Sequence, residues 1–469
     1  MFGDQAVVAS RASSRRLAYP CFILGGLILL CVLAWILTYE PTHRPWLFSH
    51  SYPLVGLDFL GRMFEVNGVR TGQNIYFPIS HEGFTYPPAA IILFLPFTYM
   101  PFETAFFTWT LVSILCLGAT YLVVLRVARS NSWSKDIAIA TWACVLTVVL
   151  FPPMQSSLAW GQTSTILLLL LTIDVLALRD RSQGVLVGVA TALKLYPGVV
   201  IFYWLARRQW RPAITASVTF LLVSTISWML WARSASYFFF HLLLDDREVD
   251  LFERLRDVDI SSAPMSFFLR MGFLPHSVAV EFGVATSLAI LVVGIVVAAR
   301  LARIGYRVTA LVTIVCTSVL VSPVAWDHYF TFAPLLVFVI MEVGLGSVPG
   351  KIAAISLALF TFPWLAFKEQ VVHPTLVRDL LTAASENALF VAALLAIASA
   401  ALAARKSWVD KDPVLGGGWP SKAPRVATTT KRAADQDRTG IISLEDRSSH
   451  FANQVLETTF QVKAAFAQR

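Results

Sequence analysis

The sequence predicts an all-α, polytopic transmembrane protein, and three observations carry that prediction. Apolar residues make up 57% of the 469-residue chain and charged residues only 14%, with a mean hydropathy of +0.67. Soluble globular chains are about 45–50% apolar and about 25% charged. The apolar residues gather in blocks, many of them near the roughly 17–25 residues that a helix needs to cross about 30 Å of hydrocarbon. Short basic connections separate several blocks, which is typical of a chain that crosses a membrane repeatedly.

The first apolar block, residues 19–38, follows Arg11, Arg15 and Arg16. It is too long for the apolar part of a signal peptide, and no small-residue cleavage site follows it. We therefore expect a retained first transmembrane helix behind a cytoplasmic N-terminus of residues 1–16. The other apolar blocks are residues 87–100, 104–125, 136–153, 163–178, 184–206, 212–232, 278–299, 308–321, 329–345, 352–366 and 385–404.

The basic connections predict the orientation of the chain. By the positive-inside rule they face the cytoplasm, and they are residues 126–135, 179–181, 207–211 and 300–307. The outer face then carries the longer segments, residues 40–86, 154–161, 233–277, 322–328 and 367–384. The net charge of +8 reflects these topology signals, so we expect a lipid bilayer and no nucleic acid as partner.

This orientation requires that two stretches do not cross the membrane simply. Residues 84–125 have to cross once although they hold two apolar runs, and residues 184–204 have to cross an even number of times. Prolines interrupt the first stretch, and Lys194 and Pro197 interrupt the second. Proline breaks helices, and broken backbone at membrane depth is tolerated where it is buried in protein or lines a cavity. We therefore expect re-entrant pieces beside a cavity, within a transmembrane domain of residues 17–404 that holds about 10–13 membrane helices.

Two features of the sequence carry no recognisable chemistry. The five cysteines lie inside apolar blocks without ligand spacing, so we expect no disulfide framework, no metal site and no cofactor; weak binding of Mg²⁺ by carboxylates stays open. Residues 405–469 turn polar and are rich in small residues, and we expect a disordered cytoplasmic tail there.

Asp58 is the first candidate for chemistry, in the long first outer loop. Residues 54–66 place apolar side chains at helical spacing, which predicts an amphipathic helix lying on the membrane. A carboxylate at such an interface loses some hydration, which suits it to act as a general base. The alternative is a surface ion pair with Arg62, one helical turn away.

Polar residues at the ends of other apolar blocks are further candidates. Lys194 lies far from either end of its block, where a lysine is costly and often functional, although its side chain could also reach an interface. His328 lies between Trp326 and Tyr329, which suits binding of a phosphate and of a sugar or prenyl chain, or else an aromatic belt. Tyr86 and Gln162 follow outer segments. The simpler explanation is that Tyr86 anchors the chain at the membrane interface and that Gln162 caps the next helix. The acidic stretch 245–259 is either a solvated helix or a part of an acceptor site.

Taken in order, several short motifs resemble glycosyltransferase family 87, the polyprenol-phosphate-mannose-dependent mannosyltransferases of actinobacteria. They cover the chain from about residue 17 to residue 404. They are Asp58, Gly72–Tyr76, Thr85–Pro88 with Leu95-Pro96, Gly161-Gln162, Leu193–Pro197 with Arg207–Arg211, and Ser322-Pro323 with Trp326–Tyr329.

The resemblance implies a C-type glycosyltransferase fold and an inverting transfer of mannose from polyprenyl phosphomannose to a glycolipid such as a phosphatidylinositol mannoside or lipomannan. It implies that Asp58 is the base, that Lys194 and His328 stabilise the leaving phosphate, and that Gln162 and Tyr86 line the donor site. The reaction would face the periplasm and would yield an α-mannoside, with an α-1,2 linkage expected.

Several alternatives stay open at this point. Family members often carry Asn-Gln-Ser after the long outer loop, whereas this chain has Ile260–Ser266 there, so the acceptor and its binding residues are unknown. An arabinofuranose donor would suit the same residues. A lipid-linked sugar flippase is the non-enzymatic alternative, although no convincing internal repeat of the kind found in transporters is apparent.

Overall fold

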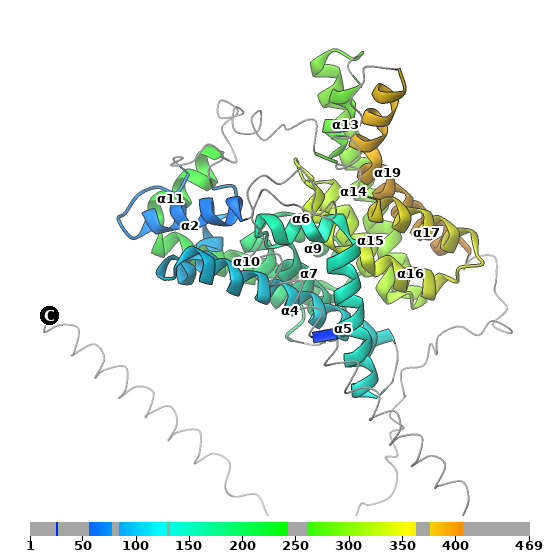
Figure 1. Cartoon of the computed structure of the whole chain (residues 1–469), viewed down its shortest axis with the longest axis horizontal. Helices are drawn as coiled ribbons and strands as arrows, with labels where there is room; N and C mark the ends of the chain where they lie inside the picture. The colour runs from blue at the N-terminus through cyan, green and yellow to red at the C-terminus, as the bar shows by residue number, and fades with distance from the viewer. Residues whose placement is uncertain are drawn as a thin grey trace, which may run out of the picture. The chain divides into compact units, whose positions relative to one another are not determined.

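The computed structural model describes residues 25–26, 56–76, 84–128, 132–179, 181–242, 261–271, 273–362 and 376–406. Every regular element within these residues is a helix, which confirms the predicted all-α class (Figure 1). The N-terminus of residues 1–16, most of the block 19–38, the acidic stretch 245–259 and the tail beyond residue 406 lie outside the described residues. The described helices of nine or more residues are α2 (Leu57–Val69), α4 (Phe102–Ala128), α5 (Trp133–Leu150), α6 (Pro152–Trp160), α7 (Ser164–Thr172), α8 (Val185–Leu193), α10 (Trp210–Leu230), α14 (His276–Ile304), α15 (Arg307–Leu320), η8 (Asp327–Leu335), α17 (Val348–Thr361) and α19 (Leu376–Lys406).

Shorter helical pieces connect or extend these helices. They are η2 (Pro88–Ala90), α3 (Ile91–Phe94), η3 (Leu95–Tyr99), η4 (Ile173–Ala177), η5 (Tyr196–Gly198), α9 (Val199–Ala206), α11 (Ala232–Tyr237), η6 (Phe238–Leu242), α13 (Pro264–Arg270) and α16 (Leu336–Val343).

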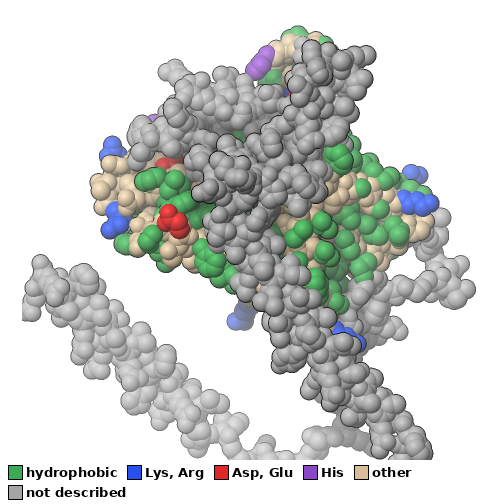
Figure 2. Space-filling model, viewed as in Figure 1, with side chains coloured by type: hydrophobic (Ala, Val, Ile, Leu, Met, Phe, Trp, Pro, Cys, Tyr) green, Lys and Arg blue, Asp and Glu red, His purple; other side chains and the backbone are tan. Residues whose placement is uncertain are grey.

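Five helices among the described residues are long and apolar enough to span a membrane. They are α4, α5, α10, α14 and the Glu386–Arg405 part of α19. Large apolar side chains point outward along α10 and α14, and on the face shown in Figure 2 apolar side chains cover much of the visible described surface. Soluble monomers rarely expose such extensive apolar area, and these faces therefore suit contact with lipid.

Both predicted interruptions are present. The run 87–100 consists of the short pieces η2, α3 and η3, and the 27-residue α4 follows it. In the second stretch, α8 ends at Leu193, Lys194 has extended backbone, and the chain resumes through η5 into α9. Each stretch therefore contains half-helices where composition alone would suggest continuous ones.

Within the described residues, several of the apolar blocks form helices too short to span a membrane alone. Four of the apolar helices have only 10–17 residues: Pro88–Tyr99, Tyr196–Ala206, Arg307–Leu320 and Val348–Thr361. In α15 every residue from Val308 to Leu320 is buried, so its apolar sequence meets other helices and not lipid. Apolar composition alone does not separate these two environments.

Close helix packing holds the elements that carry the site. The helices α14, α15, α17 and α19 pack as one group (Figure 1), and α8 packs against α10. A Cβ added at Gly188 would lie 2.5 Å from the carbonyl oxygen of Ala216, and one at Gly294 would overlap Thr317. Small residues at such crossings let helix backbones approach closely, as in other membrane helix pairs.

Candidate active site

The position of Asp58 is fixed at the start of α2. Gly56 precedes the helix with φ 78°, a conformation that favours glycine, and its N–H donates to the carbonyl of Ala159 at 2.6 Å. The fully buried ring of Phe59 packs against a group of aromatic rings, namely Phe94, Phe97, Phe106 and Trp109. The helix predicted from spacing is therefore confirmed, and burial of Phe59 anchors the turn that presents Asp58.

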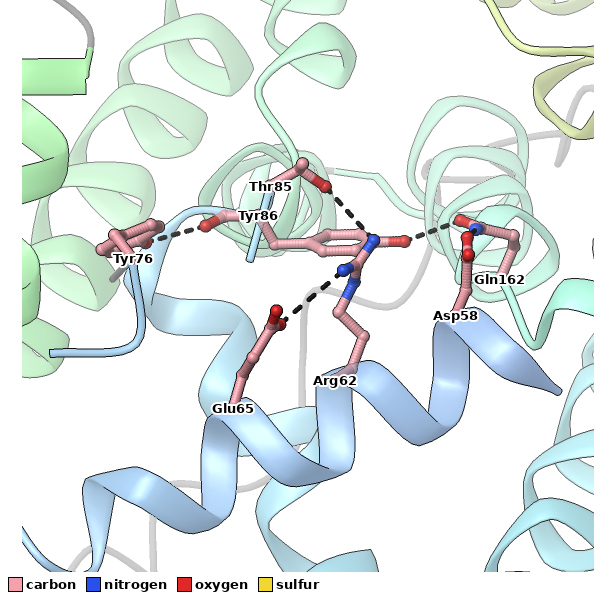
Figure 3. Close-up of polar contacts among 7 residues, drawn as sticks. All are labelled: Asp58, Arg62, Glu65, Tyr76, Thr85, Tyr86 and Gln162. Carbon is pink, nitrogen blue, oxygen red and sulfur yellow. Dashed lines mark hydrogen bonds and ion pairs between the residues drawn. The ribbon is translucent and has the colours of Figure 1, made fainter. Parts of the chain in front are cut away.

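Asp58, Gln162 and Tyr86 form a hydrogen-bonded chain (Figure 3). The Gln162 Nε2 donates to Asp58 Oδ2 at 2.5 Å, and the Tyr86 hydroxyl donates to Gln162 Oε1 at 2.8 Å. The Tyr76 hydroxyl donates in turn to the backbone carbonyl of Tyr86 at 2.8 Å. Because Gln162 and Tyr86 are buried, this chain fixes the orientation of the Asp58 carboxylate while Asp58 itself stays partly exposed.

A glycine turn brings Gln162 to this place. Gly161 ends α6 with φ 69°, and the chain bends by 116° between α6 and the α7–η4 segment. A Cβ at Gly161 would lie 2.6 Å from the Cβ of Phe59. The turn therefore needs glycine for its backbone conformation and for its contact with α2, which accounts for the Gly161-Gln162 motif.

Lys194 lies at the break between α8 and η5, within a set of three tyrosine rings. Its Nζ is 3.7 Å from the centroid of Tyr329, 5.0 Å from that of Tyr86 and 5.8 Å from that of Tyr196. The charges of Arg62 and Asp58 both act on it. Such cation–π contacts hold an ammonium group while leaving it able to meet an anion. Lys194 therefore points into the candidate site, which favours the functional interpretation over snorkelling to an interface.

His328 lies on the other side of Tyr329. Its ring stacks on Trp326, with centroids 6.0 Å apart, and meets Tyr329 edge-on at 5.0 Å. The Oδ1 of Asp327 accepts the backbone N–H of His328 at 2.7 Å and lies 3.3 Å from its Nδ1. Burial lowers the pKa of His328, and the adjacent Asp327 acts in the opposite direction. An anion near this ring would likewise favour the protonated imidazole.

The sequence interpretation considered Arg62 only as a surface ion-pair partner of Asp58, whereas the structure buries it beside the candidate site. It lies on the same face of α2 as Asp58, forms an ion pair with Glu65 at 3.7 Å and donates to Thr85 Oγ1 at 3.5 Å (Figure 3). Its guanidinium carbon is 5.4 Å from the centroid of Tyr86, the ring that Lys194 also faces. The spacing of one helical turn from Asp58 was the available signal. Two cations thus converge on one tyrosine.

The structure brings all seven predicted site residues into one continuous set of contacts. They are Asp58, Tyr86, Gln162, Lys194, Trp326, His328 and Tyr329, contributed by α2, the segment before η2, the α6–α7 turn, the α8 break and η8. The Gly72–Tyr76 motif joins this set through Tyr76, whereas the Arg207–Arg211 motif begins at the far end of α9 from Lys194. Within the described residues, three or more His, Cys, Asp or Glu side chains nowhere group in a way that could hold a metal ion.

Comparison with known proteins gives a family and several relatives. The family model described as Glycosyltransferase family 87 matches residues 84–323, just over half of the chain. The chain is 27% identical to a polyprenol-phosphate-mannose-dependent alpha-(1-2)-phosphatidylinositol mannoside mannosyltransferase of Mycobacterium tuberculosis, over 71% of this chain and 81% of the relative. It is also 27% identical to a polyprenol-phosphate-mannose-dependent alpha-(1-2)-phosphatidylinositol pentamannoside mannosyltransferase of Mycolicibacterium smegmatis, over 76% of this chain and 84% of the relative.

A more distant similarity is to an alpha-(1->3)-arabinofuranosyltransferase of Mycobacterium tuberculosis, 24% identical over 39% of this chain and 43% of the relative. No solved structure matches the chain significantly. Tyr86, Gln162 and Lys194 fall inside the region matched by the family model, whereas Asp58 precedes it and His328 follows it.

Proposed function

The chain belongs to glycosyltransferase family 87, and on this premise we propose that it transfers mannose with inversion from polyprenyl phosphomannose to a periplasm-facing glycolipid. The acceptor is of the phosphatidylinositol mannoside or lipomannan type, and the product is an α-1,2-mannoside. The names of the two similar mannosyltransferases support the donor and acceptor classes.

One observation carries this proposal: a carboxylate, a lysine and an imidazole belong to one connected site. Asp58 joins it through Gln162, and both Lys194 and His328 contact Tyr329. Inverting transfer needs a base on the acceptor side of the anomeric carbon and stabilisation of the leaving group on the opposite side. Tyr86 connects the carboxylate to the lysine, because it contacts both Gln162 and Lys194.

In the proposed reaction, Asp58 takes the proton of an acceptor hydroxyl as its oxygen attacks the anomeric carbon. The bond between that carbon and the phosphate oxygen breaks, and polyprenyl phosphate leaves with the bonding electron pair. Lys194 and Arg62 offset the charge that develops on the phosphate, and His328 in its protonated form can donate to it. Electrostatic stabilisation of this kind is usually the largest contribution to catalysis.

The test is a transfer assay with purified protein, synthetic polyprenyl phosphomannose and phosphatidylinositol mannosides. Wild type should extend the glycolipid, and Asp58→Asn should fold but lose transfer by about a hundredfold or more, as expected for a lost base. Glu103→Gln, in the first turn of α4, is a matched control and should be fully active. Equal activity of wild type and Asp58→Asn would place the base elsewhere.

The donor sugar has a second candidate, because the arabinofuranosyltransferase similarity allows a polyprenyl phosphoarabinose donor. The same assay separates the two sugars: consumption of the arabinose donor in the absence of mannose transfer would favour arabinose. Membership of a glycosyltransferase family favours catalysis over the flippase alternative.

A further inference from the structure

Three helices connect the candidate active site to a second group of charged residues. The α7–η4 segment begins directly after Thr163, next to Gln162, and ends at Ala177, two residues before Arg179. The η5–α9 segment begins beyond Lys194 and ends at Arg207, and α15 begins at Arg307 and runs toward Trp326. At 1.5 Å per residue the 14 residues of α15 span about 21 Å. The three arginines therefore lie at the end of these helices remote from Asp58.

Arg179, Arg207 and Arg307 form one cluster, called here the arginine cluster. The Arg303 guanidinium, four residues before Arg307, donates to the carbonyl of Ala206 at 2.6 Å, which brings the start of α15 close to Arg207. In agreement with this contact, the charges of Arg179 and Arg207 both disfavour the charge of Arg307. The Arg307 guanidinium donates to the carbonyl of Leu176 at 2.5 Å, and that of Arg207 donates to the Tyr203 hydroxyl at 2.9 Å. Three separate connections of the chain thus place like charges near one another.

A contact with a helix end accounts for the position of Arg307 but not for those of the other two arginines. Arg307 donates to a carbonyl at the end of η4, where helix carbonyls without partners attract cations. Arg179 is exposed and its side chain makes no hydrogen bond within the described part of the chain, and the buried Nε of Arg207 lacks a partner there too. Glu342, the acid whose charge acts on Arg307, already accepts from the backbone of Val308 and Thr309. Among the residues that the structure describes around the cluster, positive charge therefore remains in excess.

We propose that the arginine cluster binds the phosphate headgroup of an anionic phospholipid, on the membrane face opposite Asp58. Basic sites between membrane helices bind such headgroups, and the connections that hold these arginines carry the predicted cytoplasmic signal. Apolar surface for the acyl chains adjoins the cluster, because Phe202, Trp210 and Ile214 at the neighbouring ends of α9 and α10 are more than half exposed. This apolar surface distinguishes a lipid from a free phosphate ion.

Binding is measured by native mass spectrometry of the purified full chain in detergent, titrated with phosphatidylglycerol. The cluster variant is Arg179→Gln/Arg207→Gln, which leaves the Arg307 contact to Leu176 in place. We expect its affinity to fall about thirtyfold, and that of Arg179→Gln alone about fivefold, from roughly 1 kcal/mol per basic residue. The control variant Arg211→Gln/Arg405→Gln removes the same charge from exposed positions of the same predicted face that do not belong to the arginine cluster. It should bind within about twofold of wild type, because salt largely screens exposed charges that do not contact the lipid.

Two further titrations of wild type identify the ligand. Phosphatidylcholine with the same acyl chains should bind far more weakly, and inorganic phosphate should raise the unfolding temperature less than phosphatidylglycerol does. Equal binding of the two lipids, or unchanged affinity in Arg179→Gln and in the cluster variant, would overturn the proposal. Stabilisation by inorganic phosphate equal to that by the lipid would assign the cluster to a free anion and would also overturn it.

Discussion

The substitution Lys194→Met tests whether the positive charge of Lys194 acts in catalysis or only stabilises the fold. Lys194 is only partly buried. Its removal should therefore stabilise the protein by at most about 2.5 kcal/mol, the lower end of the free-energy cost of placing a lysine inside a membrane. The lost cation–π contacts, the shortest at 3.7 Å to Tyr329, are worth about 0.5–2 kcal/mol. The two contributions nearly cancel, and we expect the unfolding temperature to change by no more than about 3 °C.

The effect on turnover should be much larger. If Lys194 offsets the charge on the leaving phosphate, Lys194→Met removes an interaction that strengthens in the transition state, and kcat should fall about a hundredfold to a thousandfold. The assay pairs initial rates of mannose transfer with thermal unfolding of the same preparation. Lys194→Arg keeps the charge and should recover a part of the activity, and Lys351→Met, at an exposed lysine of α17, should behave as wild type. A variant that unfolds at a clearly lower temperature but keeps its kcat would refute the catalytic role.

Three further predictions concern neighbouring residues. Tyr329→Phe keeps the ring beside Lys194 and should retain transfer, whereas Tyr329→Leu should lose up to about thirtyfold in kcat/KM, the upper value of a cation–π contact. Gly161→Ala combines a left-handed backbone with a Cβ pressed against Phe59, and calorimetry or thermal unfolding should show a loss of about 1–3 kcal/mol. Burial lowers the pKa of His328, so the free enzyme carries a neutral imidazole at neutral pH, and binding of an anionic donor should take up a proton. The donor KM should therefore decrease as the pH falls from about 8 to about 6, and His328→Gln should abolish this dependence.

Each of these predictions has an outcome that contradicts it. Loss of activity in Tyr329→Phe equal to that in Tyr329→Leu would assign the effect to the hydroxyl and not to the ring. Gly305→Ala is the control for Gly161, because Gly305 also has positive φ but faces open space; equal destabilisation by both changes would exclude the contact with Phe59 as a cause. A donor KM that rises at low pH would mean that the donor prefers neutral His328.

The sequence predicted the helix break at Lys194 and Pro197 because charge patterning and proline are local signals. It did not predict α6, since the Pro152–Trp160 segment begins with two prolines and has polar residues at its centre, and its helix is stabilised by burial between other elements. The ion pair of Arg62 with Glu65 follows from i,i+3 spacing on one helix, whereas the contacts of Arg62 with Thr85 and Tyr86 depend on where α2 packs, which no spacing along the chain specifies. The arrangement of the half-helices around one site required the tertiary structure in the same way.

The candidate active site is assembled from segments that are far apart along the chain, and this affects its biogenesis. Asp58 and His328 are separated by more than half of the sequence. At about 5–20 residues per second, a ribosome needs roughly tens of seconds to make the chain between them. During that interval the nascent protein already contains the proposed base but not the imidazole and tyrosine of η8. Under the proposed mechanism, a partly synthesised chain in the membrane is therefore unable to cleave the donor, and activity begins only after the C-terminal half has inserted.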